Sequence, residues 1–215
     1  MKKFFNLDAP LVRAMERMGE LMVLNAWWVL CCLPVVTVGA STTAMHRMMF
    51  DLRCGDAATT RGFFRAFKAE FKKSTLLWLL MLAGAALLAV FYYLIALLEV
   101  ADTMRLAFLV VWGLLLLAWL FTLLYVFPLT AYFENTVTVT LKNALLISIS
   151  HLRQTVICAG LTLLPIVFYV LLPSRFFFLS FLWLFVLPGL QFYWKSAQLR
   201  SVFKSLSPEQ PEIDE

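Results

Sequence analysis

Two long runs of apolar residues that contain no charge restrict what this chain can fold into. They extend from Ser74 to Leu98 and from Leu106 to Phe133. Each is longer than the roughly 20 apolar residues with which an α-helix crosses about 30 Å of hydrocarbon. Hydrophobic residues make up 62% of the chain and charged residues 14%, against about 45–50% and 25% in soluble domains. We therefore predict an all-α, polytopic membrane protein. The same numbers exclude a soluble enzyme domain, a disordered chain and a disulfide-stapled secreted module.

Two further apolar runs follow, Gln154–Leu172 and Phe176–Trp194. They are shorter, but as helices each still reaches about 28 Å. Short polar breaks, Glu99–Arg105 and Pro173–Arg175, separate the two members of each pair of runs. Because lipid-exposed loops cannot lie inside the hydrocarbon, we expect each pair to form a transmembrane helical hairpin.

The first third of the chain leaves two arrangements open. Gly19–Leu33 is apolar but short, and Pro34 follows it before a second stretch, Val35–Phe50. The residue before a proline avoids the α-helical region, so we predict a break or kink at Leu33–Pro34. Residues 19–50 then either form a short hairpin, which crosses fully or re-enters, or cross the membrane once.

The positions of the basic residues favour the hairpin. Lys and Arg near membrane ends concentrate on the cytoplasmic side. With three hairpins, all of the 18 basic residues except Arg105 and Arg175 lie on that side. A single crossing would instead place the N-terminal cations outside. We therefore predict three helical hairpins with five or six membrane segments and both termini in the cytoplasm. A five-span chain with an external N-terminus is the alternative. Residues 1–206 form one transmembrane domain in this interpretation, and 207–215 form a disordered acidic tail.

The first hairpin contains a set of small and polar residues with two interpretations. Small hydroxyl residues let helices approach closely and bond across them. A broken helix beside a proline is also typical of transporters, where it lines a cavity. The set comprises Asn25, Thr37, Gly39, Ser41, Thr42 and Thr43.

The segment from Asp56 to Lys73 predicts an amphipathic helix. One helical face collects phenylalanines and the opposite face collects cations. This pattern is typical of a helix that lies along an anionic inner leaflet, with its aromatic side in the acyl boundary. The basic face is also a candidate docking surface for another membrane protein, whereas the apolar face argues against nucleic-acid binding. The residues are Arg61, Phe63, Phe64, Arg65, Phe67, Lys68, Phe71 and Lys72.

No catalytic or cofactor pattern is found in the sequence. The four cysteines, Cys31, Cys32, Cys54 and Cys158, do not have metal-ligand spacing. The four clear apolar runs contain no ionisable side chain of the kind that serves proton relays. We therefore expect no enzyme, no cofactor and no metal. A membrane-embedded enzyme would require convergence of the ionisable residues near the membrane ends: Glu20, His46, Glu134 and His151.

Several short motifs resemble the YesL family of bacterial membrane proteins. They are Asn6-Leu7-Asp8, Leu33-Pro34, Thr37, Gly39-Ala40-Ser41-Thr42-Thr43-Ala44, Phe63-Phe64-Arg65-Ala66-Phe67-Lys68, Tyr125-Val126-Phe127-Pro128 and Lys142-Asn143-Ala144-Leu145. The family is uncharacterised, and its members are commonly encoded near genes for carbohydrate uptake. The resemblance implies a bacterial cell-membrane protein with a non-enzymatic accessory role beside a sugar ABC-transporter permease. A small stand-alone transporter, with its pathway at the first hairpin, is the alternative. Self-association into a homo-oligomer is left open.

Overall fold

The computed structural model describes residues 10–56, 59–97, 101–171 and 177–206. Within these ranges the chain is all-α, which confirms the predicted fold class. The elements are α1 (Pro10–Cys32), the short 3-10 helix η1 (Val35–Thr37), α2 (Val38–Cys54), α3 (Thr60–Leu97), α4 (Asp102–Tyr132), α5 (Val137–Ser150), α6 (Leu152–Leu171) and α7 (Phe177–Leu206). The predicted tail 207–215 and the break at residues 173–175 lie outside the described residues.

The predicted break at Leu33–Pro34 is confirmed. Helix α1 ends at Cys32, and Pro34 has extended backbone angles, with φ −75° and ψ 119°. The Thr37 hydroxyl donates to the carbonyl oxygens of Cys31, at 2.6 Å, and Pro34, at 2.8 Å. Helix ends leave carbonyl groups without intrahelical partners. Thr37, which the sequence placed in the polar set of the first hairpin, therefore closes the turn between α1 and α2.

Helix α3 is the longest described helix, and it joins a basic amphipathic segment to an uncharged apolar one. Its 38 residues correspond to about 57 Å at about 1.5 Å per residue, roughly twice the thickness of membrane hydrocarbon. The basic segment expected over residues 56–73 is helical from Thr60 and continues without a break into the apolar run. It is thus the first part of α3 and not a separate element.

Helices α3 and α4 are each long and apolar enough to cross a membrane. They form a hairpin in which Trp112 Nε1 donates to the Leu88 carbonyl, at 2.9 Å, and Trp119 Nε1 donates to the Met81 carbonyl, at 3.1 Å. Helices α5 and α6 reach the length and hydropathy of a membrane span only when they are taken together. The chain bends by 102° at the break between them. The total of five or six crossings stays a prediction.

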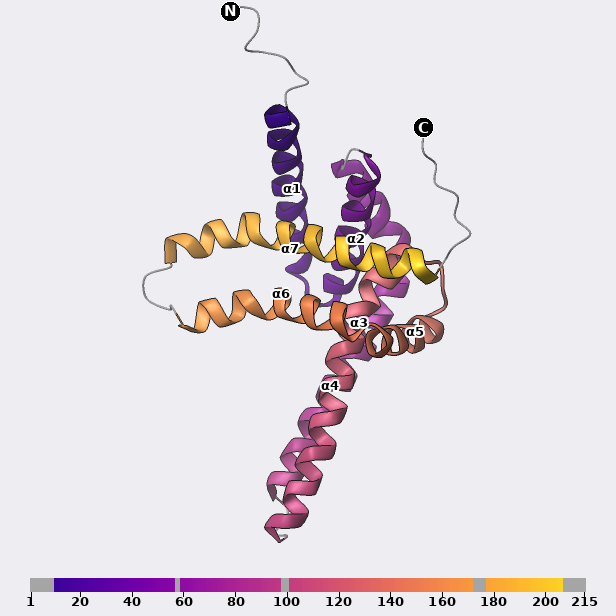
Figure 1. The fold of residues 1–215 in the computed structure, drawn as a ribbon, viewed down its shortest axis with the longest axis vertical. Helices are drawn as coiled ribbons and strands as arrows, with labels where there is room; N and C mark the ends of the chain where they lie inside the picture. Colours follow the sequence, from indigo (N-terminus) through magenta and orange to yellow (C-terminus); the bar gives the residue numbers. More distant parts are fainter. Residues whose placement is uncertain (1–9, 57–58, 98–100, 172–176, 207–215) are drawn as a thin grey trace, which may run out of the picture.

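Figure 1 shows how the three hairpins are arranged. Helices α1 and α2 lie beside the first part of α3, whereas the remainder of α3 extends away with α4. The hairpin of α6 and α7 runs crosswise to α3 and α4 in this view. In this view the two apolar hairpins therefore point in different directions.

The α1–α2 hairpin accompanies only the start of the apolar run of α3. At its tip, the Val35 carbonyl accepts a hydrogen bond from Trp78 Nε1 at 2.7 Å. Near its other end, Met48 lies against Gly62. The tip is apolar and exposed, with 74% of Leu33 and 63% of Val35 accessible. The tip thus reaches only as far as Trp78, near the start of the apolar run of α3.

Helix α2 approaches α3 closely at Gly39. A Cβ added there would lie 2.5 Å from the Ser74 carbonyl oxygen and 2.7 Å from the Cβ of Trp78. The first is a backbone atom and the second is bonded directly to the backbone, so neither can move aside unless α3 itself moves. By contrast, a Cβ at Gly113 on α4 meets nothing within 4 Å.

We predict that Gly39→Ala destabilises the fold because the added methyl group forces α2 away from α3. Overpacking of this kind costs about 1–3 kcal/mol. The measurement is the unfolding midpoint of the purified protein in mixed micelles of dodecyl maltoside and sodium dodecyl sulfate. Gly113→Ala, the matched control, should leave the midpoint unchanged or raise it. Equal destabilisation by the two variants would contradict the close α2–α3 contact.

Candidate functional site

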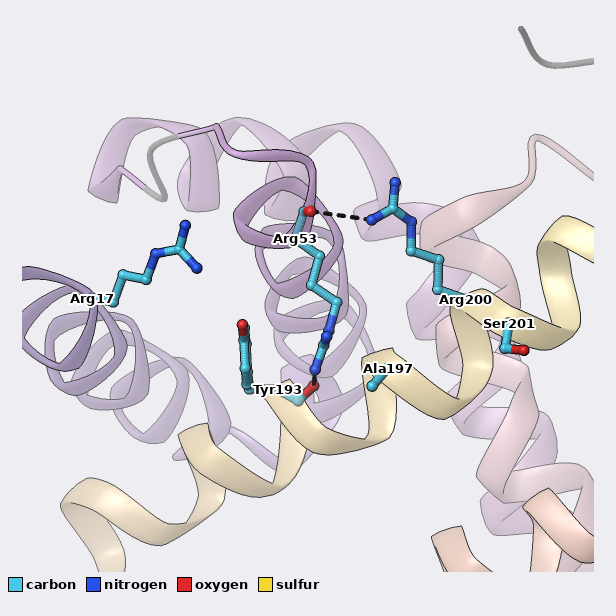
Figure 2. A pocket seen from close by; sticks show the side chains of 6 residues that line it. All are labelled: Arg17, Arg53, Tyr193, Ala197, Arg200 and Ser201. Carbon is cyan, nitrogen blue, oxygen red and sulfur yellow. Dashed lines mark hydrogen bonds between the residues drawn. The ribbon is translucent and has the colours of Figure 1, made fainter. Parts of the chain in front are cut away.

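Two hollows lie beside the α1–α2 hairpin, and both are lined by charged residues. The first, between α1, α2 and α7, has a volume of about 310 Å³. Figure 2 shows three arginines around it, one on each of these helices. We call it the arginine hollow. Its lining residues are Arg17, Arg53, Tyr193, Ala197, Arg200 and Ser201.

The second hollow lies between α2, α3 and α4 and is also about 310 Å³ in volume. Charges of both signs line it, so we call it the mixed-charge hollow: Arg47 and Asp51 from α2, Arg65 and Glu70 from α3, and Glu134 after α4. Arg47 Nε pairs with Asp51 Oδ1 at 3.5 Å. Burial raises the pKa of the Asp51 carboxyl, and the Arg47 charge opposes this shift.

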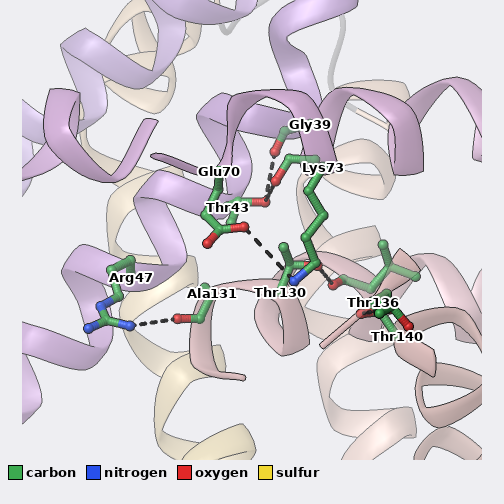
Figure 3. A network of polar contacts seen from close by, with 11 residues as sticks. Gly39, Thr43, Arg47, Glu70, Lys73, Thr130, Ala131, Thr136 and Thr140 are labelled. Carbon is green, nitrogen blue, oxygen red and sulfur yellow. Dashed lines mark hydrogen bonds and ion pairs between the residues drawn. The ribbon is translucent and has the colours of Figure 1, made fainter. Parts of the chain in front are cut away.

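A polar network connects the mixed-charge hollow to the helices around it (Figure 3). Arg47 donates to the Ala131 carbonyl at 3.1 Å, near the end of α4. Lys73 Nζ lies 3.9 Å from Glu70 Oε2 on the same helix. Of this lining, the sequence had singled out only Thr43, Arg65 and Glu134, each for a different reason, since the members come from separate parts of the chain.

The basic face predicted on α3 is exposed to solvent. Arg61, Arg65, Lys68 and Lys72 are all in the exposed class. Among the described residues, Arg61, Lys68 and Lys72 form no ion pair. The structure therefore places the four predicted cations together on one accessible surface, which we call the basic row.

The phenylalanine face of the same segment has a different environment from the one expected. Phe63 is fully buried and packs with Leu24 of α1 and Met45 of α2. The prediction that this face enters the acyl boundary is wrong for Phe63, because the α1–α2 hairpin covers that side of α3. Phe64 is 38% exposed, with its ring 5.0 Å from Trp27. Phe67 and Phe71 are half-buried, with their ring centroids 5.5 Å apart.

The polar set of the first hairpin is used in packing. The Ser41 hydroxyl donates to the Trp28 carbonyl at 3.0 Å and joins α2 to α1. Ser74 donates to the Thr43 hydroxyl at 2.9 Å and joins α3 to α2. Thr42 accepts from Trp28 Nε1 at 3.4 Å, and Asn25 is fully buried. Of the predicted set, only Thr43 lines either hollow. These contacts favour the packing interpretation over a cavity-lining one.

The ionisable residues that an enzyme would need are distributed over different environments. His46 is buried against the Phe192 ring, with centroids 4.8 Å apart. His151 follows α5, and Glu20 lies on α1. Glu134 lines the mixed-charge hollow, whereas the other three line neither hollow. Within the described part of the chain, no group of three or more His, Cys, Asp or Glu residues is arranged to hold a metal.

Comparison with known proteins gives one family-level result. Residues 21–92 match the family described as "Protein of unknown function, DUF624". The matched region extends from α1 to the later part of α3, so it includes the contacts between the first hairpin and the basic segment. No curated protein and no solved structure matches the chain.

We predict that Phe63→Ala lowers stability by about 3–5 kcal/mol, as expected when a buried phenylalanine is truncated. Phe64→Ala is the matched control on the adjacent position and should cost only about 1 kcal/mol, mainly its edge contact with Trp27. Unfolding midpoints in mixed micelles measure both. A smaller effect at residue 63 than at 64 would mean that the α1–α2 hairpin does not cover this face of α3.

Proposed function

We propose that this chain is a non-enzymatic accessory protein of the bacterial cytoplasmic membrane. In this proposal it docks through its basic row to the permease of a carbohydrate ABC transporter. The DUF624 match and the YesL-like motifs support the family context. The observation that carries the docking step is that the cations of α3 remain exposed while the opposite face is covered by the chain's own helices.

The spacing of the basic row supports an acidic partner. Its members recur every three or four residues from Arg61 to Lys72, so they are neighbours along one side of α3. Like charges at this spacing weaken a helix by about 0.2–0.5 kcal/mol per pair. An acidic surface relieves that repulsion, and complementary charge also fixes the orientation of the partners and speeds their association.

The alternative is a stand-alone transporter with its pathway at the first hairpin. The mixed-charge hollow is a polar cavity next to that hairpin, and Thr43 lines it. The position of this cavity favours the alternative. The hydroxyls of Ser41 and Thr42 argue against it, because they already form hydrogen bonds with α1. The alternative requires substrate flux in proteoliposomes that responds to substitution of Thr42 or Asn25.

Charge reversal tests the docking proposal. We expect Arg61→Glu with Lys68→Glu to reduce co-purification of the permease at least tenfold from native membranes in mild detergent. Lys142→Glu with Arg153→Glu changes the net charge equally at two exposed positions outside the row, and should retain the partner. Quantitative mass spectrometry measures the recovered permease. Unchanged recovery with the first variant counts against the basic row as the docking surface.

Orientation provides a separate test, because the proposal requires the basic row to be cytoplasmic. Cys54 is exposed and lies at the end of α2, close to the start of α3. Cys158 is buried, and Cys31 and Cys32 are half-buried. We expect a membrane-impermeant maleimide to label Cys54 in inverted membrane vesicles but not in intact spheroplasts, with Cys54→Ser as the control. Labelling of Cys54 from outside would overturn the orientation.

A further inference from the structure

The arginine hollow brings together three cations from distant parts of the chain. Arg17 comes from α1, Arg53 from the end of α2 and Arg200 from α7. None of the six residues that line the hollow is acidic. The mixed-charge hollow differs in this respect, because three carboxylates line it beside its arginines. The arginine hollow therefore has a net positive charge that its own lining does not balance.

Arg53 is held in a fixed orientation within this hollow. Its Nε donates to the Ser196 hydroxyl at 2.7 Å and to the Tyr193 carbonyl at 3.2 Å. The centre of its guanidinium lies 4.1 Å from the centroid of the Tyr193 ring. Stacking and bonding of this kind restrict a long side chain before any ligand arrives, which lowers the entropy cost of binding.

The other two arginines keep donors for a ligand. Arg200 uses Nη1 to donate to the Arg53 carbonyl at 3.1 Å, and a guanidinium has five N–H donors in all. Arg17 is exposed and has no hydrogen bond or ion pair with any described residue. Figure 2 shows Arg17 extending towards Arg53, with Tyr193 between them and Arg200 on the far side of Arg53.

The chemistry of the donors indicates the class of ligand. Guanidinium groups offer planar pairs of N–H donors that match the oxygens of phosphate and carboxylate. Three arginines with no acidic counterpart favour a ligand with more than one negative charge. The volume of about 310 Å³ exceeds that of a single phosphate and is in the range of small-ligand sites.

We propose that the arginine hollow binds a phosphate-bearing anion, supplied either by a free phosphate ester or by the headgroup of an anionic phospholipid. Arg17 and Arg200 contact the phosphate oxygens, while Arg53 on Tyr193 forms the floor of the site. The ligand joins α1 and α2 to α7. This site is separate from the basic row, so it does not depend on the docking proposal.

Calorimetric titration of the full chain in dodecyl maltoside with inorganic pyrophosphate tests a free phosphate ligand. We expect saturable binding that Arg17→Gln and Arg200→Gln each weaken at least tenfold. Arg61→Gln is the matched control, since it removes the same charge from an exposed arginine outside the hollow. Arg17→Gln removes no hydrogen bond or ion pair to a described residue, so we expect this variant to keep the wild-type unfolding midpoint while it loses binding.

Native mass spectrometry of protein purified with phosphatidylglycerol tests the lipid source. Retention of this lipid by the wild type, its loss in the Arg17 and Arg200 variants, and its displacement by pyrophosphate would support the headgroup. Saturable pyrophosphate binding without retained lipid would support a free phosphate ester. Absence of binding in both measurements, or equal weakening by Arg61→Gln, would overturn the proposal.

Discussion

The length of α3 relative to the membrane is the constraint on which the rest of this structure depends. About 20 residues cross the hydrocarbon, and α3 has 38. Its first part must therefore lie outside the hydrocarbon, where its apolar side needs cover. The α1–α2 hairpin provides that cover by burying Phe63 against Leu24 and Met45. This packing depends on Gly39, because any side chain there would collide with the α3 backbone at Ser74.

Covering one side of α3 has consequences for where the polar groups lie. The hydroxyls of the hairpin point to neighbouring helices, so Ser41 and Thr43 bond across α1, α2 and α3. The charged residues are left at the margins of this packed unit. The mixed-charge hollow forms along the α4 side, and the arginine hollow forms along the α7 side. Both hollows are thus by-products of the same packing arrangement, and their contrasting charge makes them suited to different ligands.

The sequence was informative wherever a property depends on neighbouring residues. Apolar runs identified α3 and α4, and Pro34 located the break after α1. Helical periodicity separated the basic row from the phenylalanines, but it could not say what would cover Phe63. Lipid and a protein helix are equally apolar partners for such a face. The arginine hollow was missed for a related reason: Arg17, Arg53 and Arg200 meet only after α7 has packed on the first hairpin, and no local pattern indicates that contact.

The structure also separates cations that bond to the chain's own helix ends from cations that do not, a difference that a count of charges does not show. Arg47 donates to a carbonyl near the end of α4, and Arg200 donates to one near the end of α2. Helix C-termini have unpaired carbonyls and partial negative charge, so arginine is favoured there for reasons of folding. Arg47 and Arg200 each use one N–H donor in this way and keep the others. The basic row and Arg17 have no comparable bonds to the described residues. Interaction with other molecules therefore depends on the N–H donors that folding leaves unused, and not on the total number of cations.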